Sequence, residues 1–93
     1  MINNIIVKEE RTIRIKRLSM RSMRRGTKEM DIILSGFCDG HLEKMNDDEI
    51  DLYEAFLSEN DQDLYRWISG QVSVCEPYER IVNQIKLYLI NKY

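Results

Sequence analysis

Apolar residues recur at steps of three and four along most of this 93-residue chain, which is the spacing of amphipathic α-helices. The clearest stripe lies between Thr27 and Lys44 and includes Met45, the next residue. It consists of Met30, Ile33, Leu34, Phe37, Cys38, Leu42 and Met45. The pattern predicts a long helix over 27–44 that buries one face.

Start and stop signals divide the rest of the chain into three further helices. Asn46 followed three residues later by Glu49 is a capping box, which predicts a helix over 47–58. Asp61 is the predicted cap of a short helix that ends near Gly70, and Pro77 suits the first turn of a last helix. The predicted buried positions are Ile50, Tyr53, Phe56 and Leu57, then Leu64, Trp67 and Ile68, then Tyr78, Ile81, Val82, Ile85 and Leu89.

The first segment of the chain has a mixed pattern. Residues 12–16 alternate like a strand, whereas Ile15, Leu18 and Ser22 fit one face of a helix. No second alternating run could pair with an isolated strand, so a helix over 11–24 is the better prediction. We therefore expect an all-α fold, a compact five-helix bundle, with one helical domain over 11–93 and a flexible tail over 1–10.

Charge is distributed unevenly along the chain. Residues 1–28 hold nine of the 14 Lys and Arg against two acids, a net of +7, and residues 29–93 hold five bases against 14 acids, a net of −9. This predicts a basic end and an acidic body. The basic end is compatible with nucleic-acid binding, a solvated face or an acidic protein partner. The acidic body and the lack of aromatics interleaved with the bases disfavour nucleic acid.

The N-terminal residues carry no recognisable targeting signal. The apolar run at 5–7 is short, charges begin at Lys8, and no small-residue cleavage site follows. A transit peptide would be rich in Arg and nearly free of acids, whereas Glu9 and Glu10 lie in the middle of this segment. We expect a bacterial cytoplasmic protein, with a processed mitochondrial form as the alternative.

Residues with catalytic or metal-binding chemistry are few. Cys38 and Cys75 lack a CxxC or Cys/His pattern, and each is expected to be a small, at least half-buried hydrophobe in a reduced chain. His41 is the sole histidine, which is more typical of a surface or packed residue than of a catalyst. No phosphate loop, GxSxG or HExxH is present. The sequence therefore predicts neither an enzyme nor a metal site.

The stretch RRGTKEMD, residues 24–31, is the predicted corner between the first two helices. Gly26 either closes the first helix with a positive φ or caps the second, and in that case Glu29 can reach back to its amide. Arg24 and Arg25 have no such explanation, because cations are unfavourable beside a helix N-terminus. This predicts that the corner is a functional surface.

Three segments together resemble one known family. They are LSMRSMRRGTKEMDIILSGFCD at 18–39, NDDEIDLYEAFL at 46–57 and NDQDLYRWISG at 60–70. Their order and spacing resemble the SdhE family of succinate dehydrogenase flavinylation and assembly factors, over about residues 15–90. The resemblance implies a five-helix bundle with no tightly bound cofactor. It also implies binding to the flavoprotein subunit of succinate dehydrogenase, and in some bacteria of fumarate reductase, to promote covalent attachment of FAD to that subunit.

The same resemblance implies where the partner binds. The family's R-G-x-x-E motif corresponds to Arg25, Gly26 and Glu29, and the D-L-x-x-W segment corresponds to 63–67, where we expect core packing and a helix start. The residues predicted to contact the partner are Arg21, Arg24, Arg25, Gly26, Glu29 and Asp31. We expect a monomer that binds no nucleic acid and does not insert into membranes. The alternatives are a small helical adaptor, or a nucleic-acid-binding protein that uses its basic N-terminal helix.

Overall fold

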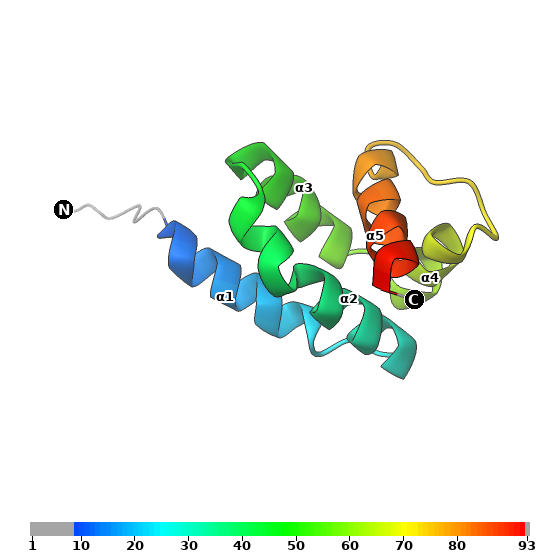
Figure 1. Cartoon of the computed structure of the whole chain (residues 1–93), viewed down its shortest axis with the longest axis horizontal. Coiled ribbons are helices and arrows are strands. Elements are labelled where there is room, and N and C mark those ends of the chain that lie inside the picture. Colours follow the sequence, from blue (N-terminus) through cyan, green and yellow to red (C-terminus); the bar gives the residue numbers. More distant parts are fainter. Residues whose placement is uncertain (1–8, 93) are drawn as a thin grey trace.

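Five α-helices and one short 3-10 helix make up the computed structural model, which describes residues 9–92. The elements are α1 (Arg11–Ser22), α2 (Lys28–His41), η2 (Leu42–Lys44), α3 (Asp47–Leu57), α4 (Asp61–Ser69) and α5 (Glu79–Lys92). Figure 1 shows α1 and α3 toward the N-terminal end and α4 and α5 at the opposite end, with α2 running from beside α4 and α5 back toward α3. No strand occurs in the described part of the chain, and the predicted all-α, five-helix fold is confirmed.

Helix α1 forms despite its strand-like start, and it ends at Ser22, two residues earlier than predicted. Ser22 is the one polar residue buried among the described residues. Its hydroxyl donates to the Leu18 carbonyl at 2.9 Å and lies 2.6 Å from the Tyr53 hydroxyl. These bonds satisfy the buried hydroxyls and join α1 to α3.

Helix α2 is interrupted before the predicted end at Lys44. Asp39 and Gly40 leave helical geometry, and Gly40 adopts a φ of 84° that favours glycine. The chain then continues as η2, which keeps Leu42 and Met45 buried as the apolar stripe requires. The predicted single helix over 27–44 is therefore a helix, a kink and a 3-10 turn.

The capping predictions for α3 and α4 differ in outcome. Asn46 and Glu49 form the predicted capping box, with bonds of 2.9 and 3.0 Å between side chains and backbone amides. The prediction that Asp61 caps α4 is wrong, because the Asn60 side chain caps this helix by accepting from the Asp63 amide. Gly70 ends α4 in the left-handed conformation, as predicted.

Helix α5 begins at Glu79, so Pro77 and Tyr78 lie in the turn before it rather than in its first turn. Tyr78 is nevertheless buried, and its hydroxyl donates to the Glu59 carboxylate at 2.9 Å. Burial, together with this bond to a carboxylate, raises the pKa of the Tyr78 hydroxyl. Tyr78 thus connects the start of α5 to the end of α3.

The core contains nearly all of the predicted residues. Ile33 and Leu89 are partly buried against it, and the remaining predicted positions of α2 to α5 are buried. Phe56 contacts Tyr53, Trp67 and Tyr78, with ring centroids 5.5 to 6.4 Å apart. Aromatic packing therefore joins α3, α4 and the turn before α5.

The residues singled out for possible chemistry are mostly packed. His41 stacks on Phe37 with ring centroids 4.5 Å apart and meets Tyr88 edge-on, as expected of a packed histidine. Both cysteines are free thiols. Cys38 is buried, and burial raises the pKa of its thiol, whereas Cys75 is exposed, contrary to the prediction.

The predicted flexible tail over 1–10 falls mainly on residues 1–8, which lie outside the described residues. Glu9 is described, and its carboxylate accepts from Arg17 at 2.9 and 3.0 Å. Within residues 9–92 no helix is long and apolar enough to cross a membrane.

The basic side chains of α1 are directed largely at the acidic side chains of α3. Arg14 donates to Glu54 at 2.9 Å and to Asp51 at 2.7 Å, and Arg17 donates to Glu54 at 3.1 Å. Arg11 pairs with Asp47 at 3.1 Å. Three arginines of the predicted basic end are therefore paired with acids of the acidic body across the contact between α1 and α3.

Glu54 gives this contact a predicted pH dependence. The hydrogen bond from Arg17, helped by the bond from Arg14, lowers the Glu54 pKa from its usual 4.5. Its stabilising effect is therefore complete above pH 4.5 and is lost as the pH falls through the lowered pKa. We expect Glu54→Gln to reduce the free energy of unfolding by about 1 kcal/mol at pH 7.

Urea unfolding at pH 7 and at a series of pH values from 4.5 down to about 2.5 measures this effect, because the loss is expected below pH 4.5. The difference between wild type and Glu54→Gln should shrink as the pH falls, and Glu43→Gln, at an exposed acid without a recorded side-chain bond, should differ little from wild type at any pH. A difference for Glu54→Gln that is constant with pH would contradict the assignment.

Candidate functional site

The corner between α1 and α2 is built differently from the prediction. Thr27 caps α2, because its hydroxyl accepts from the Met30 amide at 3.3 Å. The glycines with positive φ in the described chain are Gly40 and Gly70, so the predicted positive φ of Gly26 is wrong. The Gly26 amide donates to the Asp61 carboxylate and not to Glu29. Both predicted roles for Gly26 are therefore corrected.

Arg25 was expected to project from the corner without a structural partner, and this expectation is wrong. Only 10% of its side chain is exposed. Its guanidinium donates to Asp61 at 2.7 Å, to the Leu57 carbonyl at 2.8 Å and to the Glu59 carbonyl at 3.1 Å. A cation is favourable here because those carbonyls lie at the C-terminal end of α3, where the helix dipole is negative. Folding therefore accounts for Arg25.

Asp61 holds both the side chain and the backbone of the corner. One carboxylate oxygen accepts from Arg25 and the other from the Gly26 amide. A Cβ atom at position 26 would lie 2.9 Å from the second oxygen, which is closer than such contacts normally allow. Glycine at position 26 permits this close approach without displacing the Asp61 carboxylate, and no positive φ is involved.

The other predicted contact residues are distributed around this buried pair. Asp31 accepts from the Arg25 amide and so closes the turn locally. Glu29 and Arg24 are exposed, and Arg21 is partly exposed, 3.9 Å from Glu54. Met30, which flanks the motif, is fully buried in the core. Within the motif, Arg25 is therefore largely buried, whereas the Glu29 carboxylate is exposed.

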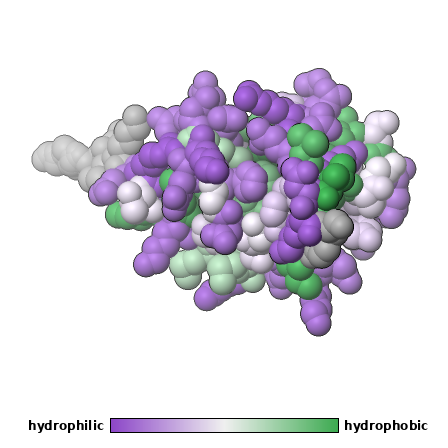
Figure 2. All heavy atoms as spheres, in the orientation of Figure 1, coloured by the Kyte–Doolittle hydropathy of each residue, from purple (hydrophilic) through white to green (hydrophobic). Residues whose placement is uncertain are grey.

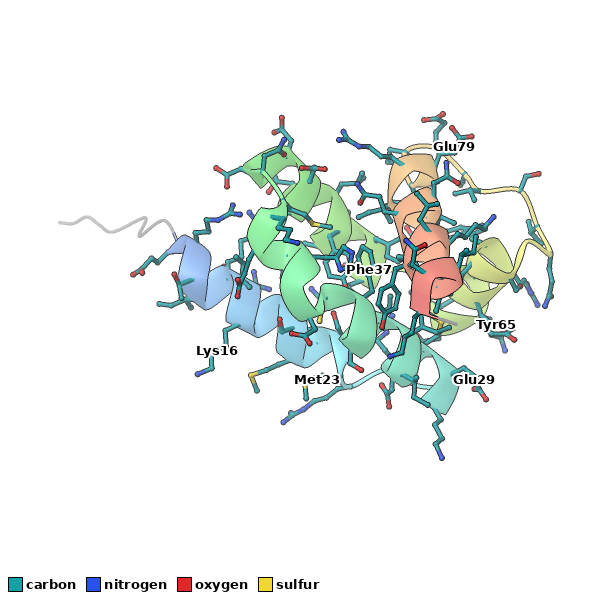
Figure 3. The ribbon with its side chains drawn as sticks, viewed as in Figure 1. Lys16, Met23, Glu29, Phe37, Tyr65 and Glu79 are labelled. Carbon is teal, nitrogen blue, oxygen red and sulfur yellow. The ribbon has the colours of Figure 1, made fainter. Side chains whose placement is uncertain are left out.

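A groove beside Glu29 adds residues from α4 that the motif does not contain. It is lined by Thr27, Glu29, Asp61, Gln62, Tyr65, Arg66 and Gln71. Figure 3 shows Glu29 and Tyr65 close together at the same end of the molecule, and 41% of Tyr65 is exposed. Tyr65 is therefore a surface residue of α4 and not part of the core.

A second hollow follows the outer face of α1. It is lined by Ile13, Lys16, Arg17, Met20, Arg21, Arg24 and Arg25. Figure 3 shows Lys16 and Met23 directed away from the bundle, and Ile13 and Met20 are also exposed. In Figure 2 the visible face is mostly hydrophilic, with small hydrophobic patches along its lower edge and over α5. The face of α1 thus combines apolar and positively charged side chains.

Within residues 9–92 no group of three or more His, Cys, Asp or Glu side chains could hold a metal ion. The distinctive features of the corner are instead an exposed carboxylate, an exposed tyrosine and exposed amides beside a buried ion pair. The fold and this arrangement define a small, all-helical protein whose candidate site is a surface for binding another protein.

Comparison with known proteins identifies the family. Residues 16–88 match the family model described as flavinator of succinate dehydrogenase. The chain belongs to this family, and the resemblance to SdhE proteins noted in the sequence is confirmed. The matched region contains the whole corner at 24–31 and the groove formed with α4.

Curated relatives support the same assignment. The chain is similar to proteins named succinate dehydrogenase assembly factor 2, mitochondrial. The relative from Penicillium rubens is 46% identical over 82 residues, which cover 84% of this chain and 26% of that protein. The relative from Schizosaccharomyces japonicus is 34% identical over 87 residues, 91% of this chain and 61% of that protein. The relative from Candida glabrata is 40% identical over 67 residues, which cover 72% of this chain and 44% of that protein. The chain thus spans between about a quarter and three fifths of these relatives.

Proposed function

We propose that this protein binds the flavoprotein subunit of succinate dehydrogenase and promotes covalent attachment of FAD to that subunit. The observation that carries the proposal is the family match over residues 16–88, which includes the corner and its exposed Glu29. The names of the relatives, as succinate dehydrogenase assembly factors, support it. The flavoprotein subunit of fumarate reductase is a further candidate partner.

The geometry favours a division of roles among the predicted contact residues. Glu29 is exposed beside the groove and can accept hydrogen bonds from a donor on the flavoprotein. Arg24 and Arg21 can meet acidic groups of the partner from the end of α1. Arg25 and Gly26 act by shaping the corner, because the Arg25 guanidinium and the Gly26 amide are already bonded within the protein.

Docking at this surface would assist flavinylation by orientation. In the attachment that the family resemblance implies, a histidine nitrogen of the flavoprotein bonds to the methyl carbon of that subunit's own flavin. The histidine N–H and one methyl C–H bond break, and the flavin ring takes up the two protons and two electrons and is left reduced, so every reacting group belongs to the partner. A bound assembly factor that favours the conformation in which histidine and flavin face one another raises the rate without supplying a catalytic group. This account assigns Glu29 a binding role and makes the protein an assembly factor rather than an enzyme.

Binding of the purified flavoprotein subunit tests the proposed surface directly. We expect a stable complex with the wild-type protein and an affinity at least tenfold weaker for Glu29→Ala, since one charge-assisted hydrogen bond is lost. Glu43→Ala, at another exposed acid, is the matched control and should bind like wild type. Equal affinities for all three proteins, measured by calorimetry, would remove Glu29 from the interface.

The nucleic-acid alternative is weakened by the partners of the basic residues. Arg11, Arg14 and Arg17 lie on the basic N-terminal helix, and each is paired with an acidic side chain. These three charges are thus largely neutralised within the protein, which leaves fewer cations for contacts with phosphates. The adaptor alternative predicts the same helical surface but no effect on covalent flavin.

Where this protein works follows from where its flavoprotein partner is assembled. The relatives are named as mitochondrial proteins, and the expectation of a bacterial cytoplasmic protein stays a prediction beside them. The predicted monomeric state also stays a prediction.

A further inference from the structure

We infer that Asp61 is a positioning residue for docking: with Arg25 it fixes the corner that carries Glu29 against α4, which carries Tyr65. The residue lies outside the R-G-x-x-E motif and was expected only to cap a helix. This inference rests on the proposed function, because it concerns the same docking surface.

Asp61 connects two parts of the chain that are far apart in the sequence. It is the first residue of α4, yet its carboxylate is bonded to Arg25 and Gly26, more than 30 residues earlier. The cap of α4 is Asn60, so helix capping does not require Asp61. Only 13% of its side chain is exposed, which leaves Arg25 and Gly26 as its recorded partners.

The ion pair between Arg25 and Asp61 also brings the corner, the end of α3 and the start of α4 together at one point. The Arg25 guanidinium also donates to the carbonyls of Leu57 and Glu59, so the same side chain contacts the end of α3 and the start of α4. A planar guanidinium with three bonded nitrogens has little freedom to rotate. The position of the corner relative to α4 is consequently fixed in more than one direction.

The groove proposed for docking crosses the junction between the corner and α4. Glu29 and Thr27 line it from the α2 side, while Gln62 and Tyr65 line it from the α4 side, and Asp61 lies between them. If the bonds of Asp61 to Arg25 and Gly26 are lost, the α2 side and the α4 side of the groove can move relative to one another although each helix stays intact. A partner that contacts both sides of the groove then binds more weakly, because the distance between the two sides must become fixed on binding, and this ordering costs free energy.

Asp61→Asn tests this role with little change in size. The variant keeps an acceptor oxygen but loses the charge, and its amide group faces either Arg25 or the Gly26 amide, both of which are donors. We expect the affinity for the purified flavoprotein subunit to fall about tenfold, measured at a temperature where circular dichroism shows the variant fully folded. Asp48→Asn, at an exposed acid near the start of α3, should keep the wild-type affinity.

A double-mutant cycle separates positioning from general stability. If Asp61 acts through the placement of Glu29, Glu29→Ala should weaken binding much less in the Asp61→Asn background than in the wild type. Additive effects, or wild-type affinity for folded Asp61→Asn, would overturn the inference. Amide exchange at Gly26 gives a readout without any partner: faster exchange in Asp61→Asn is expected, and unchanged exchange would also overturn it.

The same experiment distinguishes this inference from the proposed function. If the wild-type protein fails to bind the flavoprotein subunit, the proposed function is wrong, and the docking role of Asp61 is wrong with it. In that case faster Gly26 exchange in Asp61→Asn would still establish the bond from the Gly26 amide to Asp61. If the wild type binds and Asp61→Asn binds equally well, the proposed function stands and only the positioning role fails.

Discussion

Gly26→Arg is expected to abolish flavinylation of the co-expressed flavoprotein subunit. Even a Cβ atom at this position would lie 2.9 Å from the Asp61 carboxylate. The added guanidinium would also compete with Arg25 for the same oxygens, so the buried pair cannot keep its geometry. We expect covalent flavin to fall more than tenfold, measured by flavin fluorescence of the denatured subunit on a gel.

Gly26→Ala provides the graded comparison for this substitution. It adds the crowding of the Cβ atom without a second cation, so its effect should lie between those of wild type and Gly26→Arg. Circular dichroism of each purified variant shows how far folding is affected. Full flavinylation by a normally folded Gly26→Arg would mean that the close approach of Gly26 to Asp61 has no part in docking.

Arg25→Ala is expected to destabilise the protein by about 3 kcal/mol, because it leaves the Asp61 carboxylate buried without its cation. It also removes the donors to the Leu57 and Glu59 carbonyls. For a domain of this size, such a loss lowers the melting temperature by roughly 12 to 24 °C. Thermal unfolding followed by circular dichroism measures it.

The neighbouring arginine is the control for stability. Arg24 is exposed and no ion pair is recorded for it in the described part of the chain, so Arg24→Ala should change the free energy of unfolding by no more than about 0.5 kcal/mol. Similar melting temperatures for Arg25→Ala and Arg24→Ala would contradict the assignment of Arg25 to the folded core of the corner.

Features that depend on neighbouring residues could be predicted from the sequence. The capping box of Asn46 and Glu49, the C-cap at Gly70 and the apolar stripes all rest on spacings of three or four residues. The kink at Gly40 was missed because the apolar stripe continues through it, and glycine inside a stripe does not by itself indicate a break.

The candidate site depended on contacts that local spacing cannot reveal. The motif residues were identified by resemblance, but the partner of Arg25 lies 36 positions away in the sequence. In the sequence, Arg25 stands beside the start of a helix, where a cation is unfavourable. In the folded chain its guanidinium reaches the carbonyls at the end of α3, where a cation is favourable. The contribution of Tyr65 was equally undecidable, since one turn of a short helix fits both burial and exposure.

Under the proposed function, this protein raises the amount of flavin covalently bound to the flavoprotein subunit of succinate dehydrogenase. The direct measurement is flavin fluorescence of that subunit on a denaturing gel, after expression alone, with the wild-type protein or with Glu29→Ala, in a host that lacks its own family member. We predict strong fluorescence with the wild type and weak fluorescence in the other two samples. Equal fluorescence with and without the wild-type protein would contradict the claim.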